Sequence, residues 1–495
     1  MSKDVQLTDE GLAQGLQTRH TRMIAIGGAI GVGLFLGSGA GIEVAGPSLI
    51  LAYALVGAFI FVVMRALGEL LLYRPVSGSF ADYAREFLGP ACGFVTGWGY
   101  WITWGLIGMT EITAAGIFVK FWFPGFPQWI TALIALVVLV LLNLAKVGVF
   151  GEAEFWFASI KIVAILGLIA GGLTVILFGL GPAGGSATFS NLFALDVPGT
   201  AGGFLPFGVL GFLLAIQIAV FSYQGSELVG MTAVETKDRE RAIPKAINSV
   251  PLRIVLFYLG SLAVLMSVVP WPQFNSEDSP FVQALTQIGV PAAAGILNFV
   301  VLTSALSSCS AGALYSNARL LKRLADDGMA PRRFGALNAN RVPAAGVLAS
   351  GSFMLFGVVL NAVVPEQAFE YLLAICSLAA LWTWGVILAC HIAYRRKVKA
   401  GQRPASPYQL PAAGVLAPAG IVFLATVVVL MAFDESARIA LFALPLWAAL
   451  LAAGYFLSRR FNPRHAEFEQ KSERDEQYAR RQLQRNAEVT TADPG

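Results

Sequence analysis

Long runs of mostly apolar residues recur along this chain, and they constrain its fold more than any other feature. A helix needs about 20 such residues to cross the ~30 Å hydrocarbon layer of a membrane. We predict twelve membrane-spanning helices, at residues 23–41, 48–72, 92–121, 128–146, 154–179, 206–234, 252–270, 295–320, 343–364, 367–394, 413–433 and 438–459. Lipid-exposed strands are excluded, because the runs are too long and do not alternate. The sequence therefore predicts an all-α polytopic membrane protein.

The composition agrees with a chain that lies mostly in lipid. Of its 495 residues, 56% are hydrophobic and 13% are charged, whereas a soluble domain carries about 25% charged residues. The four cysteines lie in apolar stretches without a CxxC spacing, so we expect small buried hydrophobic residues. The three histidines stand near the ends of the predicted spans. Neither a metal site nor a cofactor is expected.

Basic residues are distributed unevenly between the loops that join the predicted spans. They cluster in alternate loops, for example at residues 237–253, 322–341 and 395–403, whereas the other loops contain Lys120 and Arg438. Short cytoplasmic loops of membrane proteins are enriched in Lys and Arg. We therefore predict that both termini are cytoplasmic.

The first predicted span is unusually rich in glycine. Between Met23 and Ile42 there are seven glycines, and each lowers helix stability by about 1 kcal/mol relative to alanine. One interpretation is close packing of helices through small residues. The other is a helix broken at Gly31–Val32–Gly33, whose freed N–H groups bind an anionic group in the middle of the membrane. The glycines alone do not decide between the two.

The sixth predicted span contains a second interruption. Its apolar run ends at Phe221 and is followed by the sequence SYQGSE, from Ser222 to Glu227, before apolar residues resume. A carboxylate or an amide near the middle of a membrane costs a few kcal/mol unless it faces protein or water. Interruptions in spans one and six, five helices apart, are typical of transporters built from inverted repeats. This spacing favours two broken helices that share a binding site.

Few other ionisable residues lie inside the spans. Lys161 has apolar neighbours on both sides, so it must pair, extend to the membrane surface or bind and release a proton. Glu111 lies deep in the third span and needs a cavity or a partner. Arg65 and Glu69 are four residues apart on the second span, so we expect a local ion pair.

Signatures of other functions are missing from the sequence. The stretch GGAIGVG is not followed by GKS or GKT, as a nucleotide-binding loop requires. No predicted span contains an aspartate, and there is no HExxH motif for a membrane-embedded protease. We therefore predict transport driven by an ion gradient or by the gradient of the solute itself, and no enzymatic activity.

Three long motifs carry a resemblance to a known family: IAIGGAIGVGLFLGSG, RALGELLLYRPVSGSFADYAREFLGP and ELVGMTAVETKDRERAIPKAINSVPLRI. With further matching stretches they cover nearly all of residues 18–455. The chain resembles amino-acid permeases of the amino acid–polyamine–organocation superfamily, in its bacterial amino-acid transporter branch. Within this branch it is most similar to D-serine/D-alanine/glycine transporters, and SFADYAREFLG also resembles asparagine permeases.

The resemblance implies a leucine-transporter-type fold with two inverted repeats of five helices and two further C-terminal helices. It divides the chain into a cytoplasmic segment, a first repeat, an extracytoplasmic loop, a second repeat, helices 11 and 12, and a cytoplasmic tail. These parts are expected at residues 1–22, 23–179, 180–205, 206–394, 413–459 and 460–495, respectively. The charged tail is expected to be solvated, partly helical and without catalytic content.

The resemblance also implies a substrate site at the two breaks. The carboxylate of an amino acid would meet backbone amides of the first break, and its ammonium would meet carbonyls of the second. The expected substrate-binding residues are Ile30, Gly31, Val32, Gly33, Glu111, Phe221, Ser222, Tyr223, Gly225 and Glu227. Lys161 matches a lysine thought to stand where sodium binds in sodium-coupled relatives, so its protonation would couple transport to H⁺. Many members have Thr where this chain has Val32, which removes a hydroxyl but leaves the backbone site.

The leading hypothesis is H⁺-coupled import of a small neutral amino acid, such as D-alanine, D-serine, glycine or L-alanine, across the bacterial inner membrane. The alternatives are a permease for asparagine or another neutral or aromatic amino acid, an exchanger and, more remotely, a sensor that binds without transport. The expected partners are the amino acid and the lipid bilayer. Neither nucleic acid nor an obligate protein partner is expected, and H⁺ takes the place of a cofactor.

Overall fold

The computed structural model describes residues 30–74, 80–144, 147–179, 187–194, 197–227 and 239–462, together with 464–466, 468 and 470. Over these residues all regular elements are helices and none is a strand. The prediction of an all-α protein is therefore confirmed for the described part of the chain. Residues 1–29, and with them the start of the first predicted span, lie outside it.

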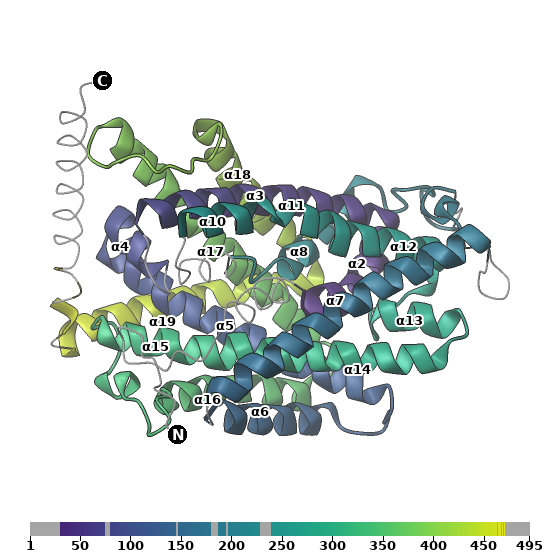
Figure 1. Ribbon diagram of the computed structural model, residues 1–495, viewed down its shortest axis with the longest axis horizontal. Helices are drawn as coiled ribbons and strands as arrows, with labels where there is room; N and C mark the ends of the chain where they lie inside the picture. Colours follow the sequence, from purple (N-terminus) through teal and green to yellow (C-terminus); the bar gives the residue numbers. More distant parts are fainter. Residues whose placement is uncertain are drawn as a thin grey trace.

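Helices overlap each of the predicted apolar runs (Figure 1). The main helices are α2 (Ser38–Ala45), α3 (Leu49–Tyr73), α5 (Pro90–Lys120), α6 (Gln128–Leu144), α7 (Val147–Phe178), α8 (Gly208–Ser222), α12 (Ser261–Val268), α14 (Pro291–Ser308), α16 (Ala344–Val363), α17 (Ala368–Lys399), α18 (Ala413–Met431) and α19 (Glu435–Phe461). Three π-helical segments continue such helices: η1 (Gly33–Gly37), η4 (Ile254–Gly260) and η6 (Cys309–Ser316).

Shorter helices join these elements and lie wholly or mostly outside the predicted apolar runs. They are α4 (Ala81–Leu88), α10 (Arg239–Asn248), α11 (Val250–Arg253), α13 (Pro280–Gln287) and α15 (Asn317–Asp326). Within the described residues, nine helical stretches are long and apolar enough to cross a membrane. The first, Gly33–Tyr73, covers two of the predicted spans, and α6 and α8 are shorter apolar helices. These lengths make the chain a multi-pass membrane protein.

Burial separates a central helix from peripheral ones. In the most apolar window of α5, 78% of the residues are buried, against 11% in α7 and in α19. α7 runs obliquely across the other helices (Figure 1), and Leu177 and Phe178 near its end are more than 70% exposed, at 79% and 74%. Large exposed apolar surfaces of this kind mark a protein that contacts lipid. α5, in contrast, is positioned to line an internal site.

The predicted ion pair between Arg65 and Glu69 is wrong. The Glu69 side chain is 1% exposed and accepts hydrogen bonds from His391 and Arg395 of α17, at 2.9 and 3.1 Å. Arg65 instead donates to Asn248 Oδ1 at 3.2 Å and to a loop carbonyl. α17 packs against α3, so it brings to the buried carboxylate the donors that a buried charge requires.

The start of the C-terminal tail also differs from its expected solvated state. His465 and Phe468 are buried, at 1% and 0% exposure. Arg464 donates to the Ala325 and Asp326 carbonyls at the end of α15, at 3.2 and 2.8 Å. This part of the tail therefore packs against the helical bundle, and residues 471–495 lie outside the described part of the chain.

Candidate functional site

Within the described residues, a helix begins after Gly31, in the middle of the first predicted span. Ile30 and Gly31 are not helical, Val32 caps the helix, and η1 continues into α2. The Gly31 carbonyl accepts from the amides of Leu34 and Phe35 at 3.2 and 3.3 Å. The amides that open a helix lack a carbonyl partner within it and carry a partial positive charge. Gly31 to Gly33 thus present the positive end of a helix to the interior.

The sixth predicted span is interrupted in its middle. α8 ends at Ser222, and a turn of five residues follows, Tyr223 to Glu227. Gly225 in this turn has φ +88°, a conformation that glycine adopts without strain. The residues from 228 to 238 lie outside the described part. The carbonyl end of α8, with its partial negative charge, is therefore exposed to the interior as well.

The two interruptions touch each other at Gly33 and Ser222. A Cβ added to Gly33 would lie 2.6 Å from the Ser222 Cα and 2.9 Å from its Oγ. Because a real Cβ essentially never lies this close to backbone, only glycine permits the contact. The hydroxyl of Tyr53 joins the two sides, at 2.6 Å from Ser222 Oγ and 3.5 Å from the Gly33 carbonyl.

Three tyrosines hold the second interruption in place. Tyr53 of α3, Tyr258 of η4 and Tyr223 pack their rings together, with Tyr223 and Tyr258 centroids 4.6 Å apart. Tyr258 donates to the Ser222 carbonyl at 3.1 Å, and Tyr223 donates to the Tyr53 carbonyl at 3.0 Å. Tyr223, one of the predicted substrate-binding residues, therefore points into this cluster and not into the cavity, and it stabilises the turn that follows α8.

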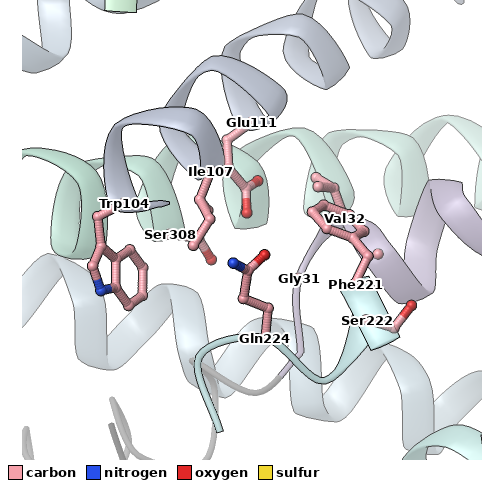
Figure 2. A pocket seen from close by; sticks show the side chains of 10 residues that line it. Gly31, Val32, Trp104, Ile107, Glu111, Phe221, Ser222, Gln224 and Ser308 are labelled. Carbon is pink, nitrogen blue, oxygen red and sulfur yellow. The ribbon is translucent and has the colours of Figure 1, made fainter. Parts of the chain in front are cut away.

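A small cavity, open on one side, lies where the first helix begins and α8 ends (Figure 2). Its walls come from four elements and are formed by Gly31, Val32, Gly33, Trp104, Ile107, Glu111, Phe221, Ser222, Gln224 and Ser308. The cavity thus brings together six of the predicted residues: Gly31, Val32, Gly33, Glu111, Phe221 and Ser222. Ile30, Tyr223, Gly225 and Glu227 do not line it.

Four lining residues were not predicted. Trp104 and Ile107 lie seven and four residues before Glu111 on α5, on one face of that helix. Helical periodicity from Glu111 could therefore have found both. Gln224 belongs to the polar run that marks the second break, whereas nothing in the sequence distinguishes Ser308 from other serines of α14.

Phe221 closes one side of the cavity. Its ring is 5% exposed and meets Phe369 of α17 edge to face, with centroids 6.5 Å apart. Glu227 lies on the other side of the turn, 2% exposed and 3.5 Å from both the Tyr100 hydroxyl and the Trp384 indole nitrogen. It therefore ties the turn to α5 and α17 and does not face the cavity.

Lys161 lies beside the non-helical residues that precede η1 and contacts Ile30. Its side chain is fully buried, at 0% exposure, so it does not extend to the membrane surface. The ammonium nitrogen lies 3.3 Å from the Ile30 carbonyl and 3.4 Å from Ser308 Oγ. Ile30 precedes the lining residue Gly31, and Ser308 itself lines the cavity. Lys161 therefore contacts the site through two neighbours without lining it.

Positive and negative helix ends and a carboxylate converge on this cavity. Over the described residues there is no cluster of side chains that could hold a metal ion. A small cavity between the start of one helix and the end of another, in a protein with many membrane-spanning helices, is typical of membrane transporters. The site suits a small ligand that carries both charges.

Known proteins agree with this class. Residues 20–467 match the amino acid permease family, and the chain belongs to this family. An uncharacterized amino acid permease of Bacillus subtilis (strain 168), YtnA, is 45% identical over 452 residues, which are 91% of this chain and 96% of that protein. A D-serine/D-alanine/glycine transporter of Escherichia coli (strain K12) is 43% identical over 462 residues, 92% of this chain and 96% of its own length.

An L-asparagine permease of Streptomyces coelicolor is 42% identical over 460 residues, 91% of this chain and 92% of that protein. These relatives are permeases and transporters, so the predicted family and the prediction that the chain is not an enzyme are confirmed. The protein is an amino acid permease in a membrane environment.

Proposed function

We propose that this protein imports small neutral amino acids into the bacterial cell together with H⁺, by alternating access across the inner membrane. The observation that carries the proposal is the direct contact of Gly33 with Ser222, where the start of one helix meets the end of another beside a cavity. Opposite helix ends that face one space suit the two charges of a zwitterion.

The carboxylate of the substrate binds to the backbone amides of Gly31, Val32 and Gly33. Its ammonium binds at the carbonyl end of α8. The Phe221 carbonyl accepts from the backbone amides of Tyr223 and Gln224, and the Ser222 carbonyl accepts from Tyr258 Oη at 3.1 Å. A carbonyl has two lone pairs, so the Ser222 carbonyl retains the capacity for a second donor. Glu111 adds negative charge to the same cavity.

Proton coupling acts through Lys161. When it is protonated, its ammonium group strengthens the hydrogen bond to the Ile30 carbonyl, because charged donors form stronger hydrogen bonds. Loss of the proton weakens the contact that holds the residue before Gly31. Binding of H⁺ is thereby linked to the shape of the first interruption, and hence to the affinity for the substrate.

The proposed topology has twelve membrane-spanning helices in two inverted repeats, residues 23–179 and 206–394, followed by two further helices at 413–459. The apolar helices described above overlap all of these spans. Both termini face the cytoplasm, since the loops rich in Lys and Arg lie on that side.

Uptake into proteoliposomes tests the proposal. Purified protein is supplied with labelled glycine, D-alanine, D-serine, L-alanine or L-asparagine, with and without an acidic outside. We expect accumulation of the small neutral amino acids only with the H⁺ gradient, and none after addition of a protonophore.

Uptake that is indifferent to both the gradient and the protonophore contradicts the coupling. Faster uptake with amino acid inside the vesicles identifies an exchanger, and binding without uptake identifies a sensor. Competition by unlabelled amino acids ranks the substrates, with preferred asparagine pointing to an asparagine permease.

Lys161→Ala tests the coupling residue. This variant is expected to lose accumulation driven by the H⁺ gradient while it still equilibrates substrate across the membrane, because the binding cavity is formed by other residues. Lys120→Ala, at the end of α5, is the control and should accumulate substrate as the unaltered protein does. Full accumulation by Lys161→Ala would remove the role of this lysine.

A further inference from the structure

The side chain of Gln224 enters the cavity from the turn that follows α8 (Figure 2). Its amide nitrogen donates to the Cys376 carbonyl of α17 at 3.3 Å. Because a carbonyl can only accept a hydrogen bond, the nitrogen must face Cys376. This contact fixes which end of the amide is oxygen, so the orientation of the group follows from its partner.

The oxygen at the other end of the amide, Oε1, has no partner among the described residues. Within the described part of the chain, Gln224 Oε1 is buried and forms no hydrogen bond. Buried polar atoms without a partner are uncommon in folded proteins, and they call for an explanation. Here the atom belongs to a residue that lines the cavity, so a ligand with an N–H or O–H group can satisfy it.

Trp104 and Ser308 also line the cavity and carry an N–H and an O–H group, but among the described residues neither donates to Oε1. Ile107 is apolar, and Trp104 presents the ring that closes this end of the cavity. In Figure 2, Gln224 lies between Trp104 and the helix ends at Gly31 and Ser222. If the two charges of a bound amino acid lie at the helix ends, its side chain extends towards Gln224 and Trp104.

Trp104 limits how far that side chain can extend. A Cβ on Gly312 of η6 would collide with the Trp104 ring, so the indole is packed directly against the η6 backbone and has no room to withdraw. On its other side it meets Tyr100 edge to face, with centroids 6.2 Å apart. The space beside Gln224 therefore suits a short side chain.

We propose that Gln224 is a specificity-determining residue, and that its Oε1 accepts a hydrogen bond from the side-chain hydroxyl of the substrate. The preferred substrate is then a small hydroxylated amino acid of the serine type. Alanine has the same carbon skeleton but no hydroxyl, so it leaves Oε1 without a donor and is the weaker substrate. This inference rests on the proposed function, because it assigns a part of the same site.

The test compares the kcat/KM ratio of serine to alanine in proteoliposome uptake, for the unaltered protein and for Gln224→Met. Methionine keeps the length of the side chain and removes both polar ends. We expect the ratio to favour serine in the unaltered protein and to fall on the order of ten-fold in the variant, the size of one hydrogen bond to a buried group. Both enantiomers are measured.

Gln217→Met is the matched control. Gln217 lies seven residues earlier, on α8, and is 6% exposed without lining the cavity. Its substitution should leave the serine-to-alanine ratio unchanged. If Gln224→Met does not reach the membrane, Gln224→Asn gives the same comparison, because the shorter side chain withdraws the oxygen.

The outcomes separate this inference from the proposed function. If the unaltered protein transports neither serine nor alanine, the proposed function fails. If it transports both and Gln224→Met keeps their ratio, Oε1 does not bind the hydroxyl and this inference alone is overturned. An equal loss for both substrates would assign Gln224 to the shared ammonium group, and would overturn it too.

Discussion

At the scale of single residues, the contact between Gly33 and Ser222 determines whether the two helix ends can share a ligand. The neighbouring atom is a backbone Cα, so it cannot rotate away as a side chain would. Tyr53 adds a hydrogen bond across the same contact. The geometry of the site therefore depends on the absence of one methyl group.

Gly33→Ala tests this dependence. The added Cβ forces the helix ends apart, and we expect uptake to be largely lost, with a destabilisation of about 1–3 kcal/mol from overpacking. Gly37→Ala, one turn later, is the control, because its Cβ would meet a flexible Leu373 methyl group at 3.3 Å and would only touch Phe221 and Ile218, at 3.9 and 4.0 Å. Uptake per mole of protein and thermal unfolding in detergent measure both effects. Full uptake by Gly33→Ala would show that the contact is not required.

Residue identities were partly readable from the sequence. The glycines and the SYQGSE run predicted where the chain is interrupted, because such residues are costly within a membrane helix. Tyr53 and Tyr258 were missed, since an aromatic residue in an apolar run is ordinary. Only the packing of α3 and η4 against the turn gives them a role. Glu227 was assigned to substrate binding, but its contacts are with Tyr100 and Trp384.

At the scale of elements, apolar runs predicted the long helices, whereas the short ones required tertiary contacts. α4 contains Asp82, Arg85 and Glu86, and all three are buried in the folded protein. Nothing in the local sequence shows that Asp82 pairs with Arg323, or Glu86 with Arg403, because these partners are distant in sequence. The predicted partner of Glu69 was wrong for the same reason. The prediction chose Arg65, four residues away, whereas His391 and Arg395 are distant in sequence.

Glu69→Gln tests the pairing that the structure shows. The variant keeps the shape of the side chain but loses charged hydrogen bonds to His391 and Arg395. We expect the free energy of unfolding to fall by about 2 kcal/mol. Arg65→Gln should have a smaller effect, below about 1 kcal/mol, since its contacts are partly exposed. Chemical or thermal unfolding in detergent compares the two, and a greater loss in Arg65→Gln would contradict this assignment.

The packing of α5 against η6 allows a second prediction for an element. Gly312→Ala pushes the Trp104 ring into the cavity, because the ring already contacts the η6 backbone. Transport of alanine should fall relative to glycine by roughly ten-fold, the effect of one methylene group in a tight pocket. Gly295→Ala, on α14, adds a Cβ with no neighbour closer than 3.8 Å and serves as control. An unchanged ratio of alanine to glycine uptake would exclude Trp104 as the limit on size.

At the scale of the whole molecule, the distribution of charge predicts which end of the bundle faces the cytoplasm. The described loops place Gly125 and Asn340 at exposed positions between successive helices. Gly125 belongs to the loop between α5 and α6, which contains few basic residues, and Asn340 to a loop rich in arginine. The positive-inside rule puts the two on opposite sides of the membrane.

Cysteine labelling in intact cells checks this orientation. A membrane-impermeant maleimide should label Gly125→Cys from outside, and should label Asn340→Cys only after the cells are permeabilised. Cys92→Ser removes the partly exposed native thiol, and the remaining three cysteines are buried. Labelling with the two positions reversed would invert the proposed topology.

The packing of the first tail residues has a practical consequence for anyone who handles this protein. Arg464 donates a hydrogen bond to the end of α15, and His465 packs against Phe94, Tyr455 and Phe468. A fluorescent protein or affinity tag fused directly after Asn462 would displace these residues and expose the aromatic surface of Phe94 and Tyr455. Such fusions should therefore be placed after residue 470, so that the contacts of Arg464 and His465 are kept.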